Sequence, residues 1–107
     1  MRLFKVQELE LKGLMFRLSQ FEKSGKGKIY NIGIMTNSDF PTDVFVQYEL
    51  TYSNSSSPVT ESNLYKITKD GDLINFKEFF NNPFEKYAFL GRCLTENIEN
   101  IEIIDNQ

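Results

Sequence analysis

The pair Asp70-Gly71, set between two apolar segments, constrains this chain more than any other feature. Asp-Gly is a preferred pair for a two-residue type I′ turn, because both central residues of that turn need positive φ. Such a turn fixes the register of a β-hairpin over residues 64–77, and one face of that hairpin then carries four apolar side chains: Tyr65, Ile67, Ile74 and Phe76. The sequence therefore predicts antiparallel β-structure here, and the turn explains its own acidic residues without further chemistry.

Alternation of apolar and polar residues predicts more strands upstream. Residues 3–11 fit an irregular strand with a bulge near Gln7, and residues 14–36 fit a second hairpin whose three-residue loop is 24–26. Residues 44–52 give the most regular strand, with Val, Val, Tyr, Leu and Tyr on one side. These segments predict a sheet in which adjacent strands are also close together in the sequence.

A short helix is predicted over residues 83–90 from the residues at its two ends. Asn82 is a favourable N-cap, the Pro that follows suits the first helical position, and Gly91 ends the segment. Residues 92–95 fit a short strand. Residues 96–105 fit both a helical stripe and an alternating strand, and we favour a final strand at 100–104.

The composition favours a mainly β or α+β fold. The chain has ten Phe and five Tyr but only one Ala, so a helical bundle would be unusual, whereas aromatic and β-branched residues suit strands. We therefore predict a single domain over residues 1–107. It should contain five to six antiparallel strands that form a curled sheet or a small barrel, with one short helix near 83–90.

The net charge and the search for targeting signals bear on the class of partner and on the cellular location. The formal net charge is −3, which argues against a dedicated nucleic-acid binder. The first residues carry charges and lack the apolar core of a signal peptide, and no apolar run is long enough to span a membrane. The single cysteine has no partner for an internal disulfide. We expect a cytoplasmic protein that does not enter the membrane.

The sequence lacks several residue types that catalytic sites commonly use. Histidine is absent, which removes the usual general base and the commonest metal ligand. Cys93 therefore has no histidine to activate it, and a buried structural thiol is the expected role. The segment 26–28 (Lys-Gly-Lys) lacks the upstream Gly and the following Ser or Thr of a phosphate-binding loop. We expect no catalytic residues, no metal site and no cofactor, and we predict that the protein is not an enzyme.

The second face of the predicted 14–36 hairpin is the candidate binding surface. Its register pairs Met with Met at one end and Phe with Ile at the other, so the candidate partner-binding residues are Met15, Phe21, Ile29, Met35 and Arg17. An open apolar patch that contains Met is typical of a protein-binding or dimer surface. The alternative is that helix 83–90 covers this face as ordinary core, and we expect it to cover at least part of it.

Three functional hypotheses follow. The first is a non-catalytic protein-interaction module: a small acidic inhibitor, immunity factor or accessory protein, of the kind that phages and mobile elements encode, whose partner is another protein or a second copy of itself. The second is a small β-barrel that contacts an anion or nucleic acid through a basic hairpin tip formed by Lys23, Lys26 and Lys28. The third is a barrel that holds a small apolar molecule.

Overall fold

A five-stranded antiparallel sheet with the order β5-β4-β3-β2-β6 forms the centre of the molecule. The structure is a computed structural model, and it describes residues 1–54, 56, 59–76 and 81–105. The strands are β2 (Gly27–Asn37), β3 (Phe40–Tyr52), β4 (Glu61–Ile67), β5 (Leu73–Asn75) and β6 (Cys93–Glu96).

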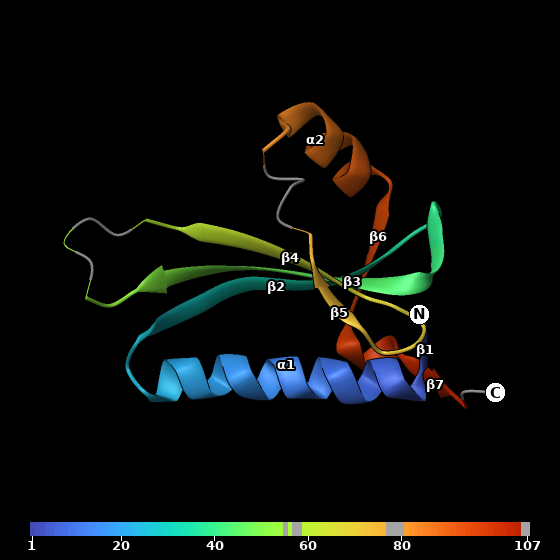
Figure 1. Cartoon of the computed structure of the whole chain (residues 1–107), viewed down its shortest axis with the longest axis horizontal. Coiled ribbons are helices and arrows are strands. Elements are labelled where there is room, and N and C mark those ends of the chain that lie inside the picture. The colour runs from blue at the N-terminus through green and yellow to red at the C-terminus, as the bar shows by residue number, and fades with distance from the viewer. Residues whose placement is uncertain (55, 57–58, 77–80, 106–107) are drawn as a thin grey trace.

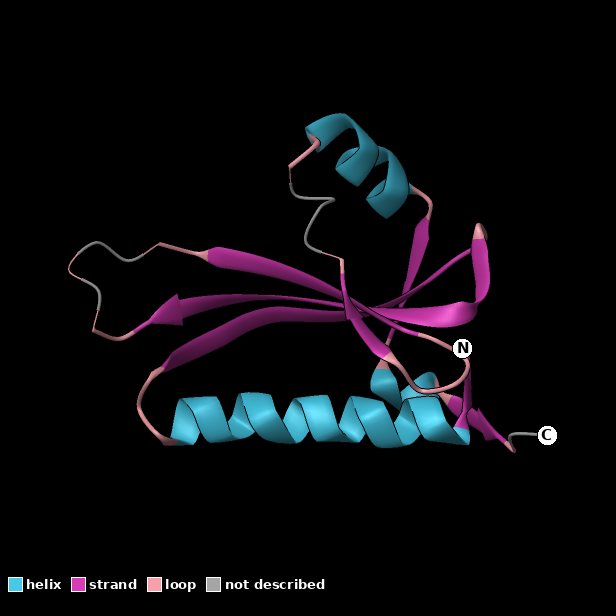
Figure 2. Cartoon of the chain, in the orientation of Figure 1, coloured by secondary structure: helices cyan, strands magenta, loops and turns pink. Residues whose placement is uncertain are grey.

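Two helices lie on opposite sides of this sheet. Helix α1 (Lys5–Lys23) runs along one face, and helix α2 (Pro83–Gly91) stands on the other (Figure 1). A separate pair of parallel strands, β1 (Arg2–Phe4) and β7 (Glu102–Ile104), joins the two ends of the chain beside the first turn of α1. A 3₁₀ turn at Ile98–Asn100 leads into β7. The arrangement is therefore helix, sheet, helix, with the small parallel pair at one end (Figure 2).

The predicted fold class is confirmed only in its coarser form. The protein is rich in strands and its main sheet is antiparallel, but that sheet is open, with β5 and β6 as its two edges, so the structure does not support a barrel. Two helices are present among the described residues instead of one, and α1 is 19 residues long.

The segment that was predicted to be strands, residues 3–24, is mostly helix α1. Its buried residues Gln7, Leu11, Leu14 and Leu18 recur at helical spacing and form one stripe against the sheet. The helix begins where the Gln7 side chain reaches back, and its Oε1 accepts a hydrogen bond of 2.9 Å from the backbone N–H of Phe4. The predicted bulge near Gln7 and the predicted 14–36 hairpin are therefore wrong, except for the strand after residue 26.

Strand β2 contains a bulge that the sequence pattern did not predict. Asn31 has φ of 54°, in the left-handed region that Asn tolerates, and the pairing with β3 shifts register between Tyr30 and Gly33. The Asn31 side chain donates a hydrogen bond of 2.7 Å to Glu49 Oε2 on β3. Because of the bulge, Ile29 and Ile34 face the same side of the sheet despite their odd spacing.

The hairpin around Asp70-Gly71 exists, but its register is one residue away from the prediction. Within this turn only Gly71 has positive φ (87°), and Thr68 pairs with Asp72 across a three-residue loop. Ile67 therefore lies opposite Leu73 instead of Ile74. A one-residue slip turns side chains to the other face, so Phe76 joins the α2 side of the sheet while Ile67 stays on the α1 side. Lys77, the last residue of the predicted hairpin, lies outside the described residues.

Other sequence predictions are confirmed. Helix α2 begins after Asn82, whose side chain accepts a hydrogen bond of 3.3 Å from the Glu85 backbone N–H, and its last residue is Gly91. Strand β3 is two-faced as predicted, with Val44 and Val46 towards α1 and Phe45 towards α2. The final strand falls within the predicted range 100–104.

The sheet separates two hydrophobic clusters of different composition. The α1 side holds an aliphatic cluster whose buried members are Leu3, Leu11, Leu14, Leu18, Ile34, Val44, Val46, Tyr48, Leu50 and Ile67. The α2 side holds a smaller aromatic cluster of Met35, Phe45, Leu64, Phe76 and Phe89, with Phe40, Leu90 and Cys93 partly buried against it. Within the described part of the chain, neither helix is both long and apolar enough to cross a lipid bilayer.

Candidate binding groove

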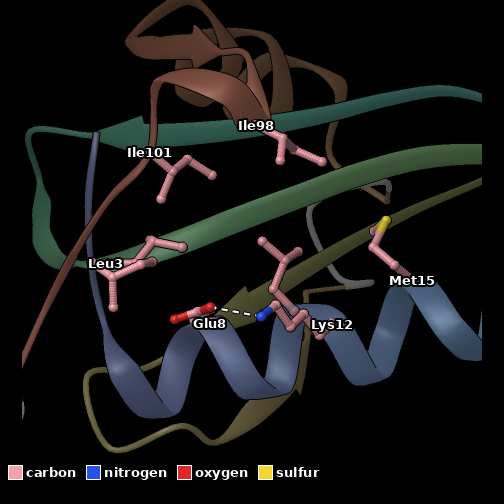
Figure 3. A pocket seen from close by; sticks show the side chains of 8 residues that line it. Leu3, Glu8, Lys12, Met15, Ile98 and Ile101 are labelled. Atoms are coloured by element: carbon pink, nitrogen blue, oxygen red, sulfur yellow. Dashed lines mark ion pairs between the residues drawn. The ribbon is translucent and has the colours of Figure 1, made fainter.

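An apolar groove runs between helix α1 and the C-terminal segment, at the margin of the aliphatic cluster (Figure 3). It consists of two hollows. The inner hollow, of about 320 Å³, is lined by Leu3, Glu8, Leu11, Lys12, Met15, Ile98, Ile101 and Ile103. The outer hollow, of about 480 Å³, is lined by Met15, Ile32, Ile34, Glu96, Asn97, Ile98 and Glu99. Met15 and Ile98 belong to both linings, so the two hollows share a wall and form one groove.

The groove is assembled from segments that are far apart in the sequence. Parallel pairing of β1 with β7 puts Leu3 opposite Ile103, and the backbone N–H of Glu102 donates a hydrogen bond of 2.8 Å to the Met1 carbonyl. The 3₁₀ turn then closes with a hydrogen bond of 3.2 Å from the Ile101 N–H to the Ile98 carbonyl. This turn holds two isoleucines opposite Met15 of α1, where Figure 3 shows them facing the helix across the groove.

The walls of the groove leave large apolar side chains in contact with solvent. Ile98 is 57% exposed, Ile32 46% and Ile103 39%, while the floor residues Leu3 and Ile34 are each 2% exposed. Single exposed apolar residues are ordinary on a protein surface, but a contiguous group around a concave apolar site is the pattern of a binding surface. A partner that covers these isoleucines would gain hydrophobic free energy that the isolated chain leaves unused.

Charged groups are placed unevenly around the groove. At the inner hollow, Lys12 Nζ lies 2.8 Å from Glu8 Oε1, and Lys5 Nζ lies 3.3 Å from Glu8 Oε2. The hydrogen bond from Lys12 lowers the pKa of the Glu8 carboxyl below its ordinary value. At the outer hollow the charged lining residues are Glu96 and Glu99, both acidic.

The five predicted partner-binding residues do not share one face. Met15 lines both hollows of the groove. Phe21 and Ile29 pack against the aliphatic cluster, and Met35 is 4% exposed on the opposite side of the sheet, within the aromatic cluster. Arg17 is on α1, where its Nη2 lies 3.5 Å from Glu10 Oε1. The predicted single surface is therefore wrong, because residues 14–23 are helical and the hairpin register does not exist.

Helix α2 covers Met35, as expected, but it cannot cover Met15. Phe89 of α2 and Met35 belong to the same aromatic cluster, whereas Met15 belongs to the α1 side. The expected partial covering is thus correct for Met35 alone.

The three lysines of the predicted basic tip do lie in one region. Lys23 ends α1, Lys26 is in the loop that follows, and Lys28 is near the start of β2; all three are exposed. Lys26 lines two neighbouring hollows, one with Tyr52 and one with Phe16. Tyr52 is 45% and Phe16 64% exposed. This tip is at the far end of α1 from the parallel strand pair (Figure 1).

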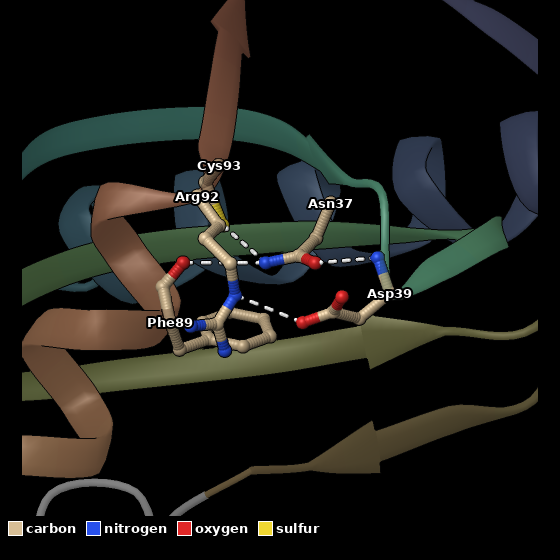
Figure 4. Close-up of polar contacts among 5 residues, drawn as sticks. All are labelled: Asn37, Asp39, Phe89, Arg92 and Cys93. Atoms are coloured by element: carbon tan, nitrogen blue, oxygen red, sulfur yellow. Dashed lines mark hydrogen bonds and ion pairs between the residues drawn. The ribbon is translucent and has the colours of Figure 1, made fainter.

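Cys93 belongs to a polar network that fixes α2 and β6 to the turn between β2 and β3 (Figure 4). Asn37 is 2% exposed, and its Nδ2 donates to the Phe89 carbonyl at 3.2 Å and lies 3.6 Å from Cys93 Sγ. Its Oδ1 accepts a hydrogen bond of 2.8 Å from the Asp39 N–H, and Asp39 in turn pairs with Arg92 at 2.8 Å. Burial raises the pKa of the Cys93 thiol, which makes it a poor nucleophile at neutral pH.

Within the described residues, no three His, Cys, Asp or Glu side chains are grouped so that they could hold a metal ion. Comparison with protein-family models, with curated proteins and with solved structures returned no match, so similarity assigns this chain to no family. Any functional conclusion must therefore come from the geometry of the chain itself.

Of the groove residues, the sequence predicted only Met15 as a binding residue, and among those it missed are Leu3 and the three isoleucines of the C-terminal segment. A weak signal was present, because Ile98 and Ile101 fit a helical stripe while Ile101 and Ile103 alternate as in a strand. The structure satisfies both patterns in turn, with a 3₁₀ turn followed by a strand. Nothing local in the sequence indicates that this segment lies against α1.

Proposed function

We propose that this protein is a non-catalytic, cytoplasmic protein-interaction module, an inhibitor, immunity factor or accessory protein, and that the groove is its binding surface. One observation carries the proposal: three exposed isoleucines and Met15 surround two adjoining hollows, the inner one mainly apolar and the outer one of mixed polarity, at the edge of an otherwise packed core. The cores of protein-binding surfaces combine apolar side chains with a rim of polar and charged groups, and this groove has both.

The shape of the groove favours a peptide segment over a small molecule. Sites for small ligands usually enclose most of the ligand surface. Here the two hollows adjoin at Met15 and Ile98, and three isoleucines in their walls are open to solvent. A linear segment with two successive apolar side chains could fill both hollows, because Met15 and Ile98 form the boundary between them.

A peptide-display selection tests this proposal directly. Peptides would be selected from a random library on the immobilised chain, and their affinities measured by fluorescence polarisation. Ile98→Asn should weaken binding about tenfold or more, because a central apolar anchor is replaced by a polar group of similar size. Val59→Asn is the matched control, since Val59 is 69% exposed and lies outside the groove; it should leave affinity unchanged.

Two results would contradict the proposal. One is a selection that returns no binding peptide. The other is a set of peptides that bind wild type, Ile98→Asn and Val59→Asn equally well. Because Ile98 is already largely exposed, the substitution should preserve the fold, and the thermal unfolding midpoint of each variant checks this.

Nucleic-acid binding is the second candidate function, and one observation favours it. Lys26 lines one hollow with the exposed Phe16 and another with the exposed Tyr52, and Lys23 and Lys28 are close to it in the sequence. Basic side chains interleaved with exposed rings suit a single strand, whose phosphates and bases they can contact. Fluorescence anisotropy with labelled oligothymidine at low salt tests it. Binding should fall with added salt and in Lys26→Glu, and an absence of binding at low salt excludes this function.

A further inference from the structure

The charge around the groove is one-sided at the outer hollow. Glu96 and Glu99 line it, and the outward continuation of the chain adds two more acidic residues, Glu102 and Asp105, while the last basic residue in the sequence is Arg92. Two of these carboxylates have cationic neighbours: Glu96 Oε2 lies 3.7 Å from the Met1 amino nitrogen, and Glu102 Oε2 lies 3.6 Å from Arg2 Nε. Glu99 is exposed and makes no ion pair with any other described residue. A bound segment would therefore meet the unpaired carboxylate of Glu99, next to the carboxylate of Glu96 whose one cationic neighbour among the described residues is the Met1 amino group.

The inner hollow shows the opposite situation. Its only acidic lining residue, Glu8, already has two ammonium partners, Lys5 and Lys12, so a ligand gains little there from charge of either sign. Six of the eight lining residues are apolar, and Leu3 and Leu11 form a buried floor. The inner hollow thus selects for an apolar side chain, and the outer hollow for an apolar side chain accompanied by a cation.

We infer that the occupant of the groove is a short segment of another protein that places one apolar side chain in the inner hollow and presents Lys or Arg beside Glu96 and Glu99. This inference rests on the proposed function and specifies its partner. Opposite charges at an interface chiefly steer encounter and discriminate between partners, whereas the apolar anchors supply most of the affinity. The basic residue is therefore a specificity element on a hydrophobic site.

A second copy of the chain is a poorer occupant on the same grounds. The chain carries a net charge of −3, so two copies repel each other overall. A symmetric dimer through the groove would also bring the acidic outer hollows of both copies to one interface, where like charges are unfavourable.

The selected peptides of the display experiment provide the test. Those that bind wild type but not Ile98→Asn should be enriched in a Lys or Arg close to an apolar residue. The double variant Glu96→Gln with Glu99→Gln keeps the shape of the outer hollow and removes its charge. It should weaken these peptides about two- to tenfold, because exposed ion pairs contribute modestly. Glu85→Gln, an exposed glutamate on α2 at the opposite side of the sheet, is the control and should have no effect.

Raising the salt concentration from about 50 to about 500 mM should weaken peptide binding to wild type by a similar factor. It should have little effect on peptide binding to the double variant, because salt screens only charges that are present. The inference is overturned if groove-dependent peptides lack basic residues and bind the double variant as tightly as wild type; the proposed function would then stand. It is also overturned if light scattering shows a concentration-dependent dimer that Ile98→Asn abolishes, since the occupant would then be a second copy. Peptides insensitive to Ile98→Asn would instead overturn the proposed function.

Discussion

Helices α1 and α2 cover opposite faces of the same sheet, and each is tied to it by the side-chain amide of one buried residue. On the α1 side, Gln7 Nε2 donates to the carbonyls of Thr42 and Ile67 at 2.8 and 3.1 Å, and its Oε1 accepts from Phe4 at 2.9 Å. On the α2 side, Asn37 Nδ2 donates to Phe89 at 3.2 Å and has only a sulfur as its second acceptor.

The two helices also differ in how much of each one is buried. Helix α1 buries four residues along its length, whereas α2 buries Phe89 alone and leaves Phe84 90% and Tyr87 68% exposed. A helix held by one ring and a weaker amide contact should open locally before one held by a full stripe. The difference indicates that the α1 side of the sheet is locally more stable than the α2 side. The groove is built on α1 and therefore lies on the more stable side.

Phe45→Ala should give the largest loss of stability. Phe45 is fully buried and its ring contacts Phe40, Phe76 and Phe89, with centroids 5.6, 5.7 and 4.9 Å away. Removal of such a ring costs about 3–5 kcal/mol of unfolding free energy. Val46→Ala, the next residue on the opposite face, should cost about 2 kcal/mol. Urea denaturation of both variants measures the ratio, and equal losses would show that the aromatic cluster is not the main support of α2.

Gln7→Leu tests the two amide attachments. The substitution keeps the volume but leaves two carbonyls and one N–H without their partner, which should cost about 2–3 kcal/mol. Asn37→Leu, at the corresponding position on the other face, should cost about 1–2 kcal/mol, since one of its contacts is to a thiol sulfur. Hydrogen exchange should further show loss of protection in α1 for the first variant and only in α2 and β6 for the second. If Asn37→Leu proved the more damaging, the assignment of α1 as the stable side would be wrong.

Gly71→Ala examines the contact between the β4–β5 turn and the first turn of α1. Gly71 has φ of 87°, and a Cβ there would approach Val6 Cβ at 3.1 Å. Backbone strain and crowding together should cost about 1–2 kcal/mol. Gly25→Ala, with φ of 76° and open space around it, should cost about 1 kcal/mol from the backbone alone. In a Val6→Ala background the difference between the two costs should narrow, because the contact with Val6 Cγ2 at 3.3 Å is lost while the contacts with Cβ and the carbonyl oxygen of residue 6 remain. An unchanged difference would show that the outer part of the Val6 side chain does not contribute to the cost.

The sequence predicted those elements whose signals are local. Strand β3 alternates cleanly because its α1 side is buried while its other face, Phe45 apart, is only partly buried. Helix α2 carries its own N-cap and terminating glycine. Helix α1 was missed because a polar residue, Gln7, occupies its buried stripe while Leu9 and Phe16 are 58% and 64% exposed. Leu14, Phe16 and Leu18 then imitate the alternation of a strand, and only tertiary packing decides between the two periods.

Local sequence patterns could not predict the strand registers or the long-range contacts, and the reason differs from that for α1. An Asp-Gly pair fits a two-residue turn and also the end of a three-residue loop, and the choice between them changes which face Phe76 occupies. The groove depends on parallel pairing between β1 and β7, at opposite ends of the chain, and no short-range pattern specifies such a pairing. The prediction of Met15 as a binding residue rests on a hairpin face that does not exist, because this residue lies in helix α1.

Glu8→Gln should have the smallest effect on the free energy of unfolding. It tests how much the charge of this carboxylate on α1 contributes to stability. The hydrogen bond from Lys12 lowers the pKa of Glu8 below its ordinary value of 4.5 in the folded protein. A carboxyl with a lowered folded pKa stabilises the protein above its unfolded pKa, and this contribution is lost as the pH falls through the folded value. The stability difference between wild type and Glu8→Gln should therefore be present at neutral pH and vanish in acid below that value. In a Lys12→Gln background the pH dependence of this difference should shrink, because its main cause has been removed. An equal difference at neutral and acidic pH would mean that Glu8 acts through packing at the groove and not through its charge.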